Sequence, residues 1–254
     1  IKRVGFGGIP IQRISQEDTN KVIDELEKCG VNFIDTARGY TVSEEYLGNA
    51  LKGRREKFYI ATKSMSRDYE SMKRDIEISL KNLQTDYIDL YQMHNVKPAE
   101  YDTLFGEDKA YRALLEAKEQ GKIKHIGITS HGLETVEKAV ESDKFETIQF
   151  PYNIVENQAD EVFKRAYEKG VGTIVMKPLA GGAIDDGTLA MKYLLSREYI
   201  DVAIPGMDSP QQVIENTDVL QNYELTEEDN KKIAKIKSEL GTNFCRRCEY
   251  CLPC

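Results

Sequence analysis

Eight short apolar runs recur along this chain, and amphipathic patterns typical of helices fill most of the intervals between them. Short buried strands that alternate with helices of this length predict a parallel sheet, because parallel neighbours are joined by a helical crossover. Eight such units, without a Gly-x-Gly-x-x-Gly turn after the first, favour an α/β fold of the closed (β/α)8 TIM-barrel type over a doubly wound sheet. The runs begin near Val4, Val31, Phe58, Tyr87, Ile123, Thr147, Gly172 and Val202, at intervals of roughly 24 to 36 residues.

Capping residues predict where several helices begin and end. Ser15 is expected to cap a helix that Gly30 stops, and Ser66 is expected to open the helix after the third apolar run. Thr226 should cap a ninth helix that follows all eight runs. Within the helix after Ser66, one face should carry Met72, Ile76, Ser79 or Leu80, and Leu83.

The chain is therefore expected to divide into a barrel at 1–225 and a C-terminal helix with a cysteine-rich tail at 226–254. Because the sequence begins with Ile1 and stops at Cys254, inside a run of cysteines, we expect both ends to be incomplete.

Charge and hydropathy narrow the classes of function. The net charge is −8, and the 43 acidic and 35 basic residues are interleaved, which argues against a nucleic-acid-binding surface. The apolar stretches are far shorter than the ~20 residues of a membrane span, and no secretory leader is recognisable. We expect a cytoplasmic protein that acts on a small molecule, without a nucleic-acid or membrane partner.

Four polar residues stand at or just beyond the ends of predicted strands. Asp35 and Tyr40 follow the second strand, Lys63 closes the third, and His94 follows the fourth. The carboxyl ends of parallel barrel strands meet at one face, so these side chains should lie together. Carbonyl reduction needs a proton at oxygen, and a phenol with a pKa of about 10 is a weak acid that needs help from neighbours. The set predicts an oxidoreductase.

A second feature is the cysteine run at the C-terminus, with the spacing C-x2-C-x2-C-x2-C. A disulfide does not suit an intracellular reductase, and four-cysteine zinc sites usually separate two C-x2-C pairs by a longer loop. The ferredoxin pattern C-x2-C-x2-C-x3-C-P is close, with one residue fewer in its last interval. The run predicts an iron–sulfur cluster of the 4Fe-4S type. The sequence does not decide whether this cluster has an electron-transfer partner. Its ligands would be Cys245, Cys248, Cys251 and Cys254, whereas Cys29 reads as a small apolar filler.

The segments DTARGY and ATKS, followed by a strand that ends in His, resemble the catalytic pattern of the aldo-keto reductases. GITSH, QFPYN, MKPLAGG and IPGMDSPQQVIEN continue the resemblance in the family order over residues 1 to about 225. CRRCEYCLPC resembles the iron–sulfur extension of a bacterial and archaeal branch. The resemblance implies NAD(P)H-dependent reduction of a small aldehyde or ketone to an alcohol. It also implies a β-hairpin before Ile1 that covers the barrel floor.

The resemblance assigns a role to each catalytic candidate. Tyr40 would be the general acid, and Lys63 would lower its pKa as a neighbouring cation. Asp35 would hold Lys63, and His94 would donate to the carbonyl oxygen or share the proton. Of the other histidines, His131 would flank the cofactor, whereas His125 is expected to pack against the barrel.

The resemblance also implies a binding site for NADP(H) or NAD(H). Thr129 or Ser130 and Gln149 would hold the carboxamide, and Met176 occupies the place of a stacking aromatic residue. The family's phosphate-binding Lys and Arg appear as Gly206 and Gln212, so weak discrimination between NADPH and NADH is expected. The full set is Thr129, Ser130, Gln149, Met176, Lys177, Leu179, Gly181, Gly206, Gln212, Glu215 and Asn216.

The substrate pocket and two alternative functions complete the expectations. Ile9, Met65 and Val96 are expected to line a pocket for a small or aliphatic carbonyl. Lys177 at a strand end allows a Schiff-base aldolase as a rival enzyme. A non-catalytic redox or nucleotide sensor on the same barrel is the other alternative.

Overall fold

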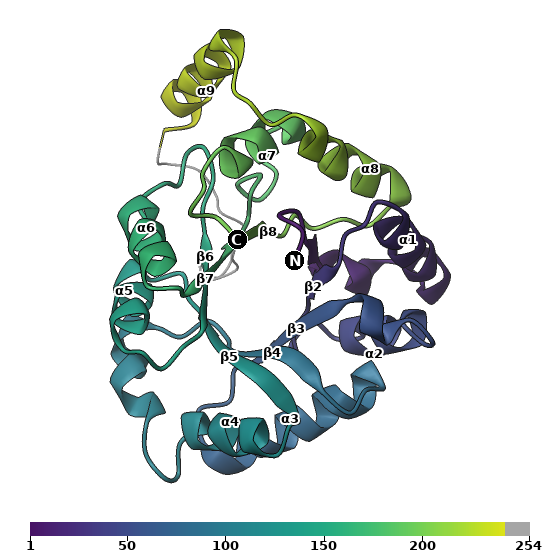
Figure 1. The fold of residues 1–254 in the computed structure, drawn as a ribbon, viewed down its shortest axis with the longest axis vertical. Coiled ribbons are helices and arrows are strands. Elements are labelled where there is room, and N and C mark those ends of the chain that lie inside the picture. Colours follow the sequence, from purple (N-terminus) through teal and green to yellow (C-terminus); the bar gives the residue numbers. More distant parts are fainter. Residues whose placement is uncertain (242–254) are drawn as a thin grey trace, which may run out of the picture.

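In the computed structural model, which describes residues 1–241, eight parallel strands form a barrel with helices around it (Figure 1). Each strand pairs with the next in chain order. The ring closes where the Ala203 N–H donates to Arg3 O and the Gly7 N–H donates to Pro205 O, both at 2.9 Å. The expected (β/α)8 fold is confirmed. The strands are β1 Phe6–Gly7, β2 Phe33–Asp35, β3 Tyr59–Ser64, β4 Ile88–Met93, β5 Ile123–Thr129, β6 Thr147–Pro151, β7 Gly172–Met176 and β8 Val202–Ala203.

The helices pack one apolar face on the strands and expose the other. In α3, Met72, Ile76, Ser79 and Leu83 are the buried residues, which is the face that the sequence predicts. The α-helices are α1 Gln16–Lys28, α2 Ser43–Ala50, α3 Tyr69–Leu83, α4 Ala110–Glu119, α5 Leu133–Glu141, α6 Asp160–Glu168, α7 Gly187–Leu195, α8 Pro210–Asp218 and α9 Glu227–Leu240. Short 3-10 turns are η1 Ile9–Arg13, η2 Arg55–Lys57, η3 Pro98–Leu104 and η4 Val219–Gln221.

Three of the four predicted helix boundaries are confirmed. The Ser15 side chain caps α1, Gly30 follows it with a φ of +71°, and Thr226 forms a capping box at the start of α9. The expected start at Ser66 is wrong, because Asp68 accepts the Ser71 N–H at 2.8 Å and caps α3. The Ser66 hydroxyl donates to Asp75 instead, at 2.6 Å.

Side chains inside the barrel form an apolar layer below a polar one. Because successive residues on a strand face opposite sides, the inward positions two residues beyond Phe33, Ala61 and Leu90 belong to Asp35, Lys63 and Gln92. The polar layer therefore lies toward the carboxyl ends of the strands. The apolar layer consists of Phe33, Ala61, Leu90, Ile174, Val202 and Ile204.

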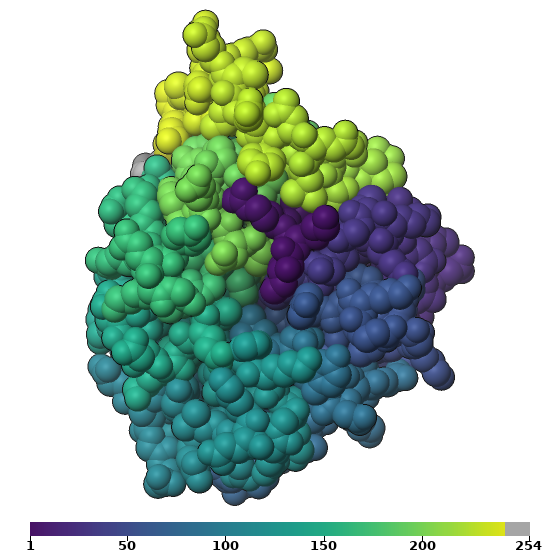
Figure 2. Space-filling view, viewed as in Figure 1, coloured from purple at the N-terminus to yellow at the C-terminus, as the bar shows by residue number. Residues whose placement is uncertain are grey.

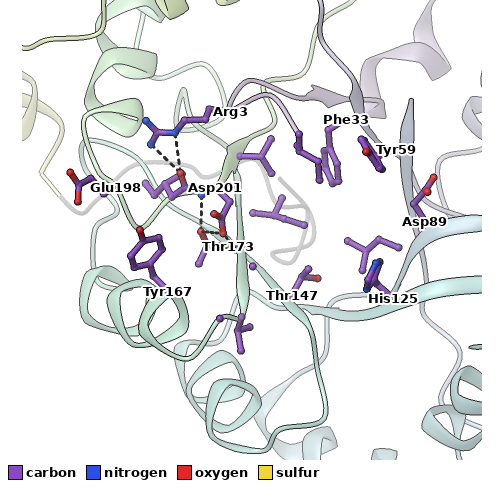
Figure 3. Close-up of a pocket in the computed structure, with 18 residues that line it drawn as sticks. Arg3, Phe33, Tyr59, Asp89, His125, Thr147, Tyr167, Thr173, Glu198 and Asp201 are labelled. Carbon is purple, nitrogen blue, oxygen red and sulfur yellow. Dashed lines mark hydrogen bonds between the residues drawn. The ribbon is translucent and has the colours of Figure 1, made fainter. Parts of the chain in front are cut away.

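A cavity of about 750 Å³ lies at the opposite end of the barrel, where the strands begin (Figure 3). Phe33, Leu90 and Val202 supply apolar walls, and Arg3 is one of its charged lining residues. This is the end that the resemblance expects a hairpin to cover. His125 was expected to pack against the barrel, and that prediction is wrong. Its side chain borders this cavity and lies 2.6 Å from a Glu146 oxygen, more than half exposed.

The last described helix, α9, projects from the rim of the barrel, whereas the N-terminal residues lie near the centre of the face that Figure 2 shows. Lys192 of α7 lies 3.3 Å from Asp229 of α9, and Ile233 is the buried residue of this helix. The cysteines at 245, 248, 251 and 254 lie outside the described residues. No helix between residues 1 and 241 combines the length and apolar character of a membrane span.

Candidate active site

A buried ion pair lies at the centre of the polar layer. Lys63 Nζ is 2.5 Å from Asp35 Oδ2, and the two side chains are 1% and 3% exposed. Lys63 also donates to Thr36 O at 2.7 Å. Burial raises the pKa of Asp35 above its usual range, and the Lys63 ammonium opposes that shift. Burial, the largest single effect, disfavours the charged form of Lys63 too. Asp35 and Tyr40 together outweigh it, so the pKa of Lys63 is raised and the ammonium persists.

Tyr40 and His94 flank this ion pair. Lys63 Nζ lies 5.0 Å from the centroid of the Tyr40 ring. The Tyr40 and His94 rings meet edge to face, with centroids 6.0 Å apart and planes at 86°. The four side chains that sequence reasoning selected from β2, β3, β4 and their loops therefore meet at one place.

Two opposing effects set the pKa of Tyr40. Burial raises the pKa of the phenol, while Lys63 acts in the lowering direction, as expected. Burial is the larger effect, so the pKa of Tyr40 lies above its usual value. The phenol is protonated at neutral pH, which is the state of an acid that has a proton to give.

His94 is a neutral base in this environment. Burial lowers its pKa to about 3, and the nearby charge of Lys63 acts in the same direction. Its Nδ1 is buried and has no hydrogen-bond partner among the described residues. A neutral imidazole carries one N–H donor and one acceptor, so His94 can bind a polar ligand without carrying a charge.

Gln92 is a buried member of the site that sequence reasoning missed. Its Nε2 donates to Asp35 Oδ1 at 3.2 Å and to Gln149 Oε1 at 2.9 Å. Its Oε1 is buried without a partner in the described part of the chain. The residue two positions before His94 on a strand faces the same side, and that spacing could have identified it.

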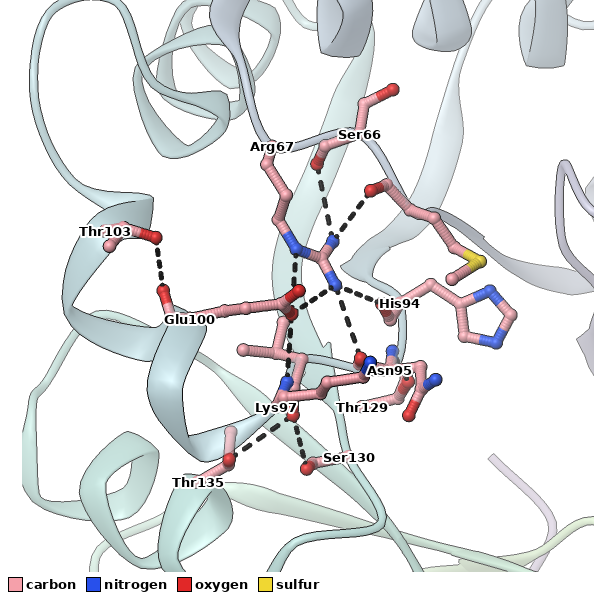
Figure 4. A network of polar contacts seen from close by, with 12 residues as sticks. Ser66, Arg67, His94, Asn95, Lys97, Glu100, Thr103, Thr129, Ser130 and Thr135 are labelled. Carbon is pink, nitrogen blue, oxygen red and sulfur yellow. Dashed lines mark hydrogen bonds and ion pairs between the residues drawn. The ribbon is translucent and has the colours of Figure 1, made fainter. Parts of the chain in front are cut away.

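Arg67 is a second residue that sequence reasoning did not place in the site, and it holds the loops behind His94 (Figure 4). Its guanidinium donates to His94 O at 2.9 Å, to Met65 O at 3.0 Å and to Glu100 Oε2 at 3.2 Å. These bonds tie the loop after β3 to the loop after β4. The pattern of charges in the sequence contains no hint of this role.

The predicted cofactor residues lie on β5, β6 and β7 or in the segments after β5, β7 and β8, whereas the catalytic candidates lie on β2 and β3 or in the segments after β2 and β4. The two sets occupy adjacent arcs of one barrel end, because the strands pair in chain order. Thr129, the last residue of β5, pairs in register with Gln149 in the middle of β6. The Thr129 hydroxyl accepts the Asn95 N–H at 2.7 Å, and the Ser130 hydroxyl donates to Val96 O at 2.6 Å.

The loop after β7 turns sharply beside this arc. Met176 packs against the apolar layer, and Leu179 packs against the main core. Lys177 and Gly181 have φ values of +56° and +69°. The glycine thus serves a turn that few other residues adopt readily.

The segment after β8 begins α8 and contains the last predicted cofactor residues. Gly206 lies against Pro10, and a Cβ at this position would approach Pro10 Cγ to 2.9 Å. Gln212 Oε1 accepts the Asp208 N–H at 2.8 Å. Glu215 accepts from Gln211, and Asn216 donates to Gln212 O, both at 2.8 Å.

Comparison with known proteins assigns the family. Residues 3–189, more than half of the chain, match the model of the aldo/keto reductase family. The chain belongs to the aldo/keto reductase family. This membership supports oxidoreductase activity on a carbonyl substrate.

Similar proteins come from plants and bacteria. L-galactose dehydrogenase of Arabidopsis thaliana is 25% identical over 94% of this chain and 91% of that protein. Methylglyoxal reductase DkgA of Escherichia coli (strain K12) is 29% identical over 90% and 88%. The holo form of aldo-keto reductase AKR11C1 from Bacillus halodurans superposes with a TM-score of 0.79 at 26% identity, over 92% of this chain and 91% of that one.

Two of the three residues expected to line the substrate pocket of this aldo/keto reductase have exposed side chains. Ile9 and Met65 are 40% and 59% exposed, so their contact with a substrate stays a prediction. Val96 is completely buried, so it offers no surface to a ligand. In residues 1–241, no group of three or more His, Cys, Asp or Glu side chains is placed to hold a metal.

Proposed function

We propose that this aldo/keto reductase reduces a small aldehyde or ketone with a nicotinamide cofactor, and that Tyr40 is the general acid. The arrangement of Tyr40 beside the buried Lys63–Asp35 pair carries this proposal. The cofactor, when bound, supplies hydride to the carbonyl carbon. The protein residues manage the proton and the charge on oxygen.

Each residue has a role in that proton transfer. Tyr40 Oη gives its proton to the substrate oxygen, and the Lys63 ammonium stabilises the resulting phenolate. Asp35 keeps Lys63 charged in a site that excludes water. Since the pKa of His94 is about 3, its neutral ring can donate a hydrogen bond to the carbonyl oxygen but does not supply the proton. Two roles were expected for His94, donation of a hydrogen bond to the carbonyl oxygen and sharing of the proton. Its low pKa favours hydrogen-bond donation.

The residues present fit a nicotinamide cofactor. Gln92 Oε1 and His94 Nδ1 are two buried polar atoms without partners in the described chain, as expected where a polar ligand binds. Thr129, Ser130 and Gln149 would hold the carboxamide, and Met176 would pack on the ring. The rest of the cofactor would contact Lys177, Leu179, Gly181, Gly206, Gln212, Glu215 and Asn216.

A carbonyl panel tests the proposed activity. Aldehydes, ketones and sugars should include substrates that consume NADH or NADPH. Binding of the cofactor without turnover across the panel would favour the sensor. A covalent adduct trapped by borohydride with substrate would favour the Schiff-base aldolase at Lys177.

Gln212→Arg should tighten NADPH binding by about tenfold and leave NADH nearly unchanged, because a charge-assisted bond to the 2′-phosphate would form. The segment 204–216 holds no Lys or Arg, and Asp208 adds a like charge. Dissociation constants from fluorescence titration of each cofactor measure the effect. Gln211→Arg adds the same charge one position away and is the matched control. A strong preference of the unaltered protein for NADPH would contradict the explanation.

The four tail cysteines are proposed to bind an iron–sulfur cluster, a donor set suited to 4Fe-4S. We propose a boundary between barrel and appendage near residue 225, and a cytoplasmic location, where thiols stay reduced. Hydride transfer moves two electrons together and needs no one-electron centre. The cluster would therefore serve structure or electron relay, with a partner in the second case.

Removal of residues 245–254 should leave carbonyl reduction close to that of the full chain. Anaerobically purified full-length protein should be brown and contain iron and acid-labile sulfide, and replacement of the four cysteines by Ser should abolish both. Zinc without sulfide would show that the cluster assignment is incorrect. Loss of turnover in a folded, shortened protein would show that the tail takes part in catalysis.

A further inference from the structure

The strand that carries Lys63 is held from outside the barrel by two carboxylates. The hydroxyls of Thr62 and Ser64, which flank Lys63, face outward. Thr62 Oγ1 donates to Glu44 Oε1 at 2.8 Å, and Ser64 Oγ donates to Asp75. Glu44 belongs to α2 and is only 1% exposed, and Asp75 belongs to α3. Two helices thus fix the strand on either side of the buried lysine.

Arg38 joins both carboxylates to the loop that carries Tyr40. Its Nη1 donates to Glu44 Oε2 at 3.0 Å. Its Nε lies 3.8 Å from Asp75 Oδ1, which is an ion-pair contact without a hydrogen bond. Its backbone N–H donates to Lys63 O at 2.9 Å. Arg38 is two residues before Tyr40, so one residue connects the Tyr40 loop to the Lys63 strand through both its side chain and its backbone.

The loop needs such restraint because it contains backbone strain. Thr41, directly after Tyr40, has a φ of +40°, a region that β-branched residues rarely adopt. Strain of this kind persists only where the surrounding structure holds the chain in place. The Tyr40 N–H donates to Ala37 O at 3.0 Å, and the Ser43 N–H donates to Tyr40 O at 2.8 Å, so the turn is short and closed.

We infer that Arg38 is a positioning residue that holds the Tyr40 hydroxyl against Lys63 through its links to Glu44, Asp75 and the Lys63 backbone. The inference rests on the proposed function, because it assigns to Arg38 an effect that acts through the acid. Glu44 accepts from four side chains, the others being Ser79 at 2.7 Å and Asn82 at 3.3 Å. It therefore provides a fixed anchor for the arginine rather than a mobile surface partner.

Arg38→Met should lower kcat at least about tenfold and leave KM and the cofactor dissociation constant within about twofold, because proton transfer depends on geometry more than substrate binding does. Arg38→Lys should recover part of the loss, since it keeps the charge but not the two-armed contact. Arg165→Met removes an exposed arginine 3.8 Å from Glu137 and is the matched control, expected to keep full activity. Circular dichroism and thermal melting confirm that each variant is folded.

A double-mutant cycle separates positioning from general structural support. If Arg38 acts through Tyr40, Arg38→Met should cause no further loss of kcat in a Tyr40→Phe protein. Equal losses in both backgrounds, or wild-type kcat for folded Arg38→Met, would overturn the inference. If Arg38→Met does not fold, the same double-mutant cycle with Tyr40→Phe is measured with Arg38→Lys and with Asp75→Asn. A Tyr40→Phe enzyme with full turnover would overturn the proposed function itself, and a loss at Tyr40 without one at Arg38 would overturn only the positioning role.

Discussion

Replacement of Tyr40 by Phe should lower kcat at least about 100-fold, the lower range for the loss of a general acid. The phenol is the group beside Lys63 that carries a proton at neutral pH, because burial raises its pKa. His94 does not replace it, since its pKa of about 3 leaves the ring without an acidic proton to give. The ring of Phe fills the same space, so the cofactor dissociation constant should change by less than about twofold.

Steady-state kinetics with the best carbonyl substrate, at saturating cofactor, measure this loss. Tyr167→Phe removes an exposed phenol at the other end of the barrel and serves as the control. The kcat of the unaltered enzyme should also be nearly flat between about pH 5 and 8, because neither Tyr40 nor His94 changes its charge in that range. Turnover of the Phe variant close to that of the unaltered protein would contradict Tyr40 as the acid.

Lys63→Met should abolish measurable reduction and lower the free energy of unfolding by about 3–5 kcal/mol, the range for breaking a buried ion pair. The long apolar side chain of Met fits the space, but Asp35 is left as an uncompensated carboxylate that is 3% exposed. Asp35→Asn combined with Lys63→Met removes that charge. The double variant should therefore regain much of the stability while its activity stays absent.

Denaturant unfolding measures the stability difference, and cofactor consumption measures the activity. Lys28→Met breaks an exposed pair with Glu25, 2.8 Å apart, and should cost no more than about 1 kcal/mol. A single variant as stable as the double variant would show that Asp35 is not held charged by Lys63. Activity in the double variant would exclude Lys63 from catalysis.

The barrel was predictable because its determinants are local. Each strand is a short apolar run, and each helix between them shows its own apolar face and caps. The catalytic candidates followed from strand ends, where a polar residue at the end of an apolar run is conspicuous. Asp35, Lys63 and His94 all satisfy that pattern.

The residues that sequence reasoning missed contact other residues that lie far away in the sequence. Arg67 binds the His94 carbonyl 27 residues away, and Gln92 reaches Asp35 across 57 residues. The predictions for Val96 and His125 were wrong because each assumed how far the side chain is buried. The identity of a residue does not determine its burial. The lowering effect of Lys63 on the pKa of Tyr40 could be predicted, because the charge of Lys63 is visible in the sequence, but the larger raising effect of burial could not.

The barrel closes by pairing one segment that is synthesised early with another that is synthesised late. The strand β1 emerges from the ribosome before the other seven barrel strands, and its partner segment at 203–206 emerges almost 200 residues later. Throughout that time the growing sheet has an open edge, which could pair with another nascent chain. However, β1 is only two residues long and lies within a glycine-rich segment, which makes it a poor template for pairing. We therefore expect the brevity that weakens β1 as a strand to limit pairing between unfinished chains at this edge.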